Sequence, residues 1–133
     1  HLVTVTGPGG GTTTFLYDAV GRKIGTISTD PDGSGPLPRI AKRISYNDDD
    51  QVTKVEDGTA TDVTAGALAA MSVTQVTDTI YNSYGEKIVE TISSGGAAYQ
   101  LRQYSYDGAA RLECAAMRMN PAAFGALPAS ACA

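Results

Sequence analysis

The sequence contains no tryptophan, a single histidine and only two cysteines. The histidine is the first residue, so catalysis by a Ser-His-Asp or Cys-His arrangement would depend on a terminal side chain. Two cysteines and one remote histidine also fall short of the ligand set of a structural zinc site. We therefore expect no enzymatic activity, no metal ion and no cofactor.

Basic residues and long apolar runs are scarce as well. The ten lysines and arginines are scattered, and the formal net charge is -4. Surfaces that bind nucleic-acid phosphates are normally basic, so we expect no nucleic-acid partner. No stretch approaches the ~20 consecutive apolar residues of a membrane-spanning helix, so membrane insertion is not expected either. Because the sequence does not start with Met, we interpret it as a piece of a longer protein.

What the sequence does contain is a short pattern that recurs at irregular intervals. The copies read YDAVGRKIGTIS, YNDDDQVTKVED, YNSYGEKIVETIS and YDGAARLECAAM, and they begin at Tyr17, Tyr46, Tyr81 and Tyr106. Each has Asp or Asn after the tyrosine, then Gly, Asp or Ala three residues later, then a polar residue and an apolar run. The irregular spacing argues against a strict solenoid and favours a repeated hairpin with variable outer loops.

The order of residue types is typical of a β-hairpin turn. A tyrosine near the end of a strand can half-bury its ring and still bring its hydroxyl to the backbone. Asp or Asn starts a turn by accepting backbone N–H groups ahead of it, and Gly closes a bulged hairpin in the left-handed conformation. Asp50 reaches that conformation at some cost, and Ala110 fits it poorly. We therefore expect a different or looser turn in the fourth copy.

We assign the structural repeat to the following residues: Tyr17, Asp18, Gly21, Arg22, Tyr46, Asn47, Tyr81, Asn82, Gly85, Tyr106, Asp107 and Arg111.

The segments between the copies predict loops and short helical turns. Residues 29–38 are dense in turn-forming residues and predict a surface loop. Residues 64–72 predict a short helix that buries Leu68 and Met71. Near the C-terminus, NPAAFGALP predicts a single helical turn capped by Asn120 and anchored by Phe124.

The loop sequence DPDGSG partly matches the pattern of a calcium-binding loop. Asp30, Asp32, Ser34 and Gly35 match the first half of a calcium-binding loop, but Ala41 stands where the bidentate glutamate belongs. We therefore interpret this segment as a simple turn.

The two cysteines, Cys114 and Cys132, are candidates for a disulfide. The segment between them contains two prolines and the expected helical turn, which can bring its ends together. Such a bond would contribute about 3 kcal/mol if it is unstrained. The alternative is two separate thiols.

The repeated residues resemble the RHS family, also called YD-repeat proteins. The resemblance is carried by Tyr17-Asp18-Gly21-Arg22 and, less completely, by the copies at Tyr46, Tyr81 and Tyr106. It implies two-stranded hairpins joined side by side in one continuous, spiralling sheet, which in long members closes into a shell around a toxin. It also implies a bacterial surface or secreted protein. The sequence shows no aspartate-based self-cleavage segment and no toxin domain.

These observations predict an all-β chain of consecutive antiparallel hairpins that form a curved open sheet, with one or two short helical turns in loops. We divide it into a flexible or edge arm (1–13), the hairpins (14–116) and a C-terminal segment (117–133). A sheet this small would keep two open edges, which invite further strands. We expect a non-catalytic structural module that pairs with neighbouring repeats or identical subunits, as a homo-oligomer or extracellular filament. The alternatives are part of a toxin-enclosing shell, or an adhesin segment that binds glycan or protein.

Overall fold

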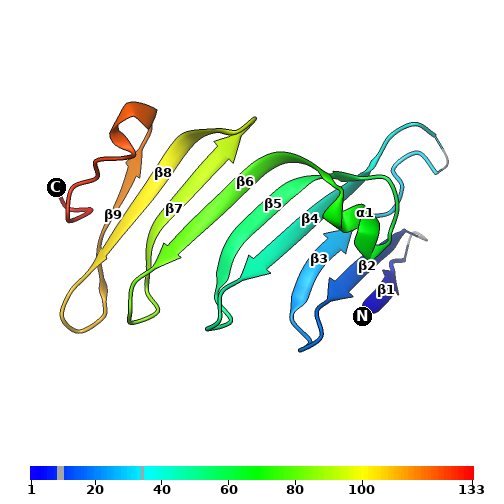
Figure 1. The fold of residues 1–133 in the computed structure, drawn as a ribbon, viewed down its shortest axis with the longest axis horizontal. Coiled ribbons are helices and arrows are strands. Elements are labelled where there is room, and N and C mark those ends of the chain that lie inside the picture. The colour runs from blue at the N-terminus through cyan, green and yellow to red at the C-terminus, as the bar shows by residue number, and fades with distance from the viewer. Residues whose placement is uncertain (9–10, 34) are drawn as a thin grey trace.

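The computed structural model describes residues 1–8, 11–33 and 35–133, so Ser34 of the tested calcium loop lies outside the described residues. All the described strands belong to one antiparallel sheet, and their order across the sheet is their order in the chain. The sheet is open, with β1 and β9 at its edges (Figure 1). The predicted all-β sheet of consecutive hairpins is therefore confirmed.

The strands in chain order are β1 (Leu2–Thr6), β2 (Thr12–Tyr17), β3 (Lys23–Ile27), β4 (Arg39–Tyr46), β5 (Val52–Ala60), β6 (Ser72–Tyr81), β7 (Lys87–Ser94), β8 (Ala97–Tyr106) and β9 (Leu112–Arg118).

The four sequence copies form the tight turns along one border of the sheet (Figure 1). We call these the tyrosine turns and number them 1 to 4: residues 17–22, 46–51, 81–86 and 106–111. In each hairpin, an outgoing strand (β2, β4, β6 or β8) ends at the tyrosine and a return strand (β3, β5, β7 or β9) follows the turn. The spacing of the copies is irregular because the strands, as well as the connections along the opposite border, differ in length.

The hydrophobic core lies where helix α1 (Ala65–Ala69) covers the sheet near β2 to β5. Leu68 of the helix packs with Leu16, Ile27 and other buried apolar residues, and Met71 belongs to the same cluster. Gly25 makes this close contact possible, because a Cβ atom at that position would lie 2.3 Å from a methyl carbon of Leu68. The helix is shorter than the predicted 64–72, with Thr64 as its N-cap, but the predicted burial of Leu68 and Met71 is confirmed.

The C-terminal segment folds back against β8 and β9. The predicted disulfide is present between Cys114 and Cys132. Gln103 donates its side-chain Nε2 to the Pro128 carbonyl at 2.7 Å, and the Ala131 N–H donates to the Ser105 hydroxyl at 2.7 Å. These contacts and the disulfide hold the segment on the last hairpin of the sheet.

The expected helical turn in that segment is the 3-10 helix η1 (Pro121–Ala123), capped by the side chain of Asn120. Phe124 follows it and is half-buried. Of the helices in the described part of the chain, none is long and apolar enough to cross a bilayer.

Candidate functional site

The four tyrosine turns share one backbone geometry. In each, the N–H of the Asp or Asn donates to the carbonyl of the residue four positions on, at 2.9–3.0 Å. The Oδ1 atom of the same side chain accepts the N–H groups two and four positions on. The strand register shifts immediately before each tyrosine, as a β-bulge requires. The side chain of the Asp or Asn therefore holds every turn closed from within.

The residue four after each tyrosine has a positive φ angle. Gly21 and Gly85 reach φ 90 and 80, and Asp50 and Ala110 reach φ 60 and 62. The expectation that the fourth turn would be looser is wrong, because the N–H of Ala110 donates to the Asp107 carbonyl at 3.0 Å, as its counterparts do at 3.1–3.2 Å. The hydrogen bonds to the Asp107 side chain hold the turn in spite of the strain at alanine.

The second and last residues of each tyrosine turn also pair through their side chains. In turns 1 and 4 an aspartate pairs with an arginine, Asp18 with Arg22 at 2.7 Å and Asp107 with Arg111 at 2.9 Å. In turns 2 and 3 an asparagine donates to the glutamine or glutamate four positions on, at 2.9 Å in both. Turns 1 and 4 are thus chemically alike, and turns 2 and 3 form a second pair.

These contacts also set the acidity of the two aspartates. Burial raises the pKa of the Asp18 carboxyl, but the hydrogen bonds from Arg22 and the backbone outweigh it and bring the pKa below its ordinary value. For Asp107, the hydrogen bond from the backbone N–H of Arg111 is the largest cause of a pKa below the ordinary value. Both carboxyls are therefore ionised at neutral pH, as acceptors of several hydrogen bonds should be.

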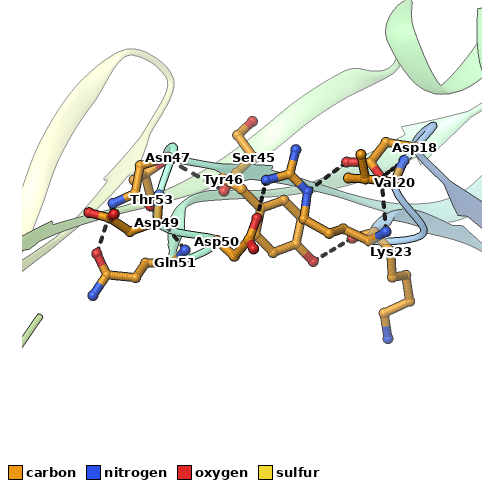
Figure 2. Close-up of polar contacts among 11 residues, drawn as sticks. Asp18, Val20, Lys23, Ser45, Tyr46, Asn47, Asp49, Asp50, Gln51 and Thr53 are labelled. Carbon is orange, nitrogen blue, oxygen red and sulfur yellow. Dashed lines mark hydrogen bonds and ion pairs between the residues drawn. The ribbon is translucent and has the colours of Figure 1, made fainter.

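Neighbouring hairpins are joined by a contact that we call the tyrosine latch. The hydroxyl of Tyr46 donates to the Lys23 carbonyl at 2.6 Å (Figure 2). In the same way, Tyr81 donates to Val52 at 2.7 Å and Tyr106 to Lys87 at 2.8 Å. The acceptor is always the first residue of the preceding return strand. Each tyrosine therefore fastens its own hairpin to the one before it.

The first tyrosine occupies the same place in its turn but meets strand β1. The N–H of Tyr17 donates to the carbonyl of His1 at 2.8 Å, and the two aromatic rings are 6.1 Å apart.

A second kind of contact bridges the turns themselves. Nη1 of Arg22 donates to Asp50 in turn 2 at 2.6 Å, and the guanidinium also lies over the ring of Tyr46. Nε2 of Gln51 donates to the carbonyl of Gly85 in turn 3 at 3.1 Å. In both bridges, the last residue of one turn donates a hydrogen bond to the next turn. The acceptor there is the fourth residue after the tyrosine.

This bridge is missing between turns 3 and 4. The corresponding residue is Glu86, whose side chain makes no hydrogen bond to turn 4 among the described residues. Its Oε2 atom is buried without a hydrogen-bond partner among the described residues. A hollow of about 250 Å³ lies beside it, lined by Tyr84, Glu86, Asp107, Gly108 and Ala110.

Comparison with known proteins bears on the first of these turns. Residues 1–34, which contain β1, β2, turn 1 and β3, match the family model described as RHS Repeat. No curated protein matches the chain. The family match confirms the resemblance expected from the tyrosine turns and supports an RHS, or YD-repeat, family fragment. The RHS repeat is a structural repeat unit.

Sequence reasoning identified the turn residues but missed their partners in the neighbouring hairpins. The latch acceptors at Lys23, Val52 and Lys87 are backbone carbonyls, which any residue type supplies. A signal did exist for the bridges, because a long polar side chain ends every turn, at Arg22, Gln51, Glu86 and Arg111.

Removing a latch hydroxyl should destabilise the sheet. We expect Tyr81→Phe and Tyr106→Phe each to lower the free energy of unfolding by about 1 kcal/mol, because each change leaves a carbonyl without its donor. Urea unfolding measures the loss. Tyr84→Phe is the matched control, since this side chain is 86% exposed. The latch is disproved if the control loses as much stability as the two variants.

Relieving the backbone strain that the positive φ angle causes at Ala110 should stabilise turn 4. We expect Ala110→Gly to raise the free energy of unfolding by roughly 0.5–1 kcal/mol, because glycine adopts this conformation without the clash of a Cβ atom. Ala109→Gly in the same turn should lower it by roughly 0.5 kcal/mol, since only chain entropy changes there. Equal effects of the two changes in thermal unfolding would argue against strain at Ala110.

Restoring a donor at residue 86 should repair the missing bridge. In Glu86→Gln, the side-chain oxygen can still accept a hydrogen bond from Asn82. The new amide N–H group can donate to turn 4, as that of Gln51 donates to turn 3. We expect the free energy of unfolding to rise by about 1 kcal/mol, because a buried orphaned acceptor is removed. Glu113→Gln removes the same negative charge at an exposed position and therefore controls for electrostatics. A similar gain in both variants would assign the effect to net charge.

Proposed function

We propose that this chain is a non-catalytic structural module of a bacterial surface or secreted RHS-like protein. The module continues a β-sheet by pairing its edge strands with neighbouring repeats or with identical subunits. The observation that carries the proposal is that every joint between hairpins uses backbone pairing, while β1 and β9 each pair on one side only among the described residues. An edge strand of this kind presents unpaired N–H and C=O groups to other chains.

The side chains of the two edge strands support the same function. Every residue of β1 is exposed, including Leu2 and Val5, and on β9 Leu112 and Met117 are exposed too. Sheets that end without a partner commonly carry lysine or proline on the edge to prevent pairing. Neither β1 nor β9 contains a lysine or a proline. Both edges are thus suited to receive a further strand.

The test is the association state of the purified, oxidised chain. We expect sedimentation velocity to show association that grows with concentration, because open edges pair with one another in the absence of further repeats. Val5→Lys and Met117→Lys, which place a charge on β1 or β9, should reduce it. Ile80→Lys is the matched control, because its exposed side chain lies on the central strand β6.

Two results would contradict the proposal. One is a chain that stays monomeric at every concentration. The other is association that the edge variants and the central-strand control reduce equally. Electron microscopy of the associated material separates filaments from small closed oligomers.

A further inference from the structure

The tyrosine latches define what an added hairpin must offer to the open edge at β9. In the three latches of the sheet, the acceptor carbonyl belongs to Lys23, Val52 or Lys87, each the first residue of a return strand. The next residue in this series is Leu112, the first residue of β9. It pairs with Tyr106 across the hairpin, as Lys23 pairs with Tyr17. Leu112 therefore holds the position of a latch acceptor at the open edge.

The carbonyl of Leu112 points away from the sheet. The carbonyl before it, at Arg111, accepts the N–H of Asp107 at 2.9 Å and so points toward β8. Successive carbonyls of a strand point to opposite sides, which directs that of Leu112 to the free edge. Lys23 is placed identically, because Arg22 accepts the N–H of Asp18 at 2.9 Å and Lys23 then accepts Tyr46. Leu112 is 57% exposed, so the edge is accessible there.

Two kinds of strand could pair with β9: the β1 strand of a second copy, or the outgoing strand of a further hairpin. The strands alternate in direction across the sheet, so β1 and β9 run the same way. A second copy that placed its β1 against β9 with the same face forward would pair in parallel, unlike every joint within the chain. In either orientation of the copy, β1 does not end in a tyrosine turn and so brings no tyrosine beside Leu112. An outgoing strand that ends in Tyr-Asp or Tyr-Asn is antiparallel to β9 and brings its tyrosine beside Leu112.

Turn 4 also indicates the charge of the occupant. Arg111 pairs through Nε with Asp107, just as Arg22 pairs with Asp18. Arg22 then uses Nη1 to reach Asp50, the fourth residue after the tyrosine of the next turn. Arg111 is 78% exposed and, within residues 1–8, 11–33 and 35–133, its Nη atoms make no hydrogen bond. The β9 edge thus reproduces the β3 edge, whose neighbour is the acidic turn YNDDDQ.

We propose that the β9 edge is a docking site for the outgoing strand of a further hairpin whose turn reads Tyr-Asp or Tyr-Asn with an acidic residue four after the tyrosine. The tyrosine hydroxyl donates to the Leu112 carbonyl, and the acidic side chain pairs with Arg111. The occupant that makes both contacts is a repeat of this type; the β1 edge of a second copy supplies neither the tyrosine nor the acidic residue. The inference rests on the proposed edge pairing and specifies its partner.

The hairpin of residues 39–60 from this chain is a ready probe, because it contains Tyr46 and Asp50 and no cysteine. We would add the synthetic peptide to the full, oxidised, 15N-labelled chain and follow the backbone amides by NMR. The expected result is shifts at β9 and none at β1. A Tyr46→Phe peptide should bind about fivefold more weakly, the effect of one lost hydrogen bond. An Asp50→Asn peptide should bind about threefold more weakly, and an Asp49→Asn peptide, the matched control, as well as the parent.

Several results would overturn the inference. They are the absence of shifts at β9 at the highest peptide concentration, shifts at β1 in their place, or equal binding of the parent and Tyr46→Phe peptides. If the chain associates through its edges but the peptide fails these criteria, edge pairing stands and the choice of partner is wrong. If the chain stays monomeric and the peptide does not bind, both proposals fail.

Discussion

The rest of the structure depends on a side-chain carboxylate or amide that accepts hydrogen bonds from the backbone of its own turn. In all four tyrosine turns, Asp or Asn accepts two N–H groups of its own turn. This contact fixes the direction of the return strand and places its first carbonyl at the outer side of the hairpin. The tyrosine of the next hairpin then finds an acceptor in a constant position. Local turn chemistry is thereby converted into a regular joint between hairpins.

The parts of the fold that could be predicted from sequence are those encoded by local residue types. Tyrosine, Asx and a residue tolerant of positive φ recur in order, and they indicated the hairpins, the bulges and the open all-β sheet. The pair of cysteines and the capped turn at Asn120 were predictable for the same reason. The helix was located correctly but proved shorter than predicted. The close fit of Leu68 above Gly25 was not predictable, because it joins two segments that are distant in the sequence.

Prediction failed where one residue was judged apart from its neighbours. Ala110 is a poor residue for its conformation, yet turn 4 closes because Asp107 and Arg111 add three hydrogen bonds around it. The latches, and the acceptors of the bridges, were also beyond prediction, since these acceptors are mostly backbone carbonyls of another hairpin. Their regularity becomes visible only once the register of all the strands is known.

The missing bridge at Glu86 has a mechanical consequence. The joints between hairpins 1 and 2 and between hairpins 2 and 3 each hold by a latch and a bridge, whereas the joint between hairpins 3 and 4 holds by its latch and strand pairing. Along the border of the tyrosine turns, this last joint therefore has one contact fewer to resist separation. The final hairpin, tied to its own tail by the disulfide, would move as one unit if the joint opened.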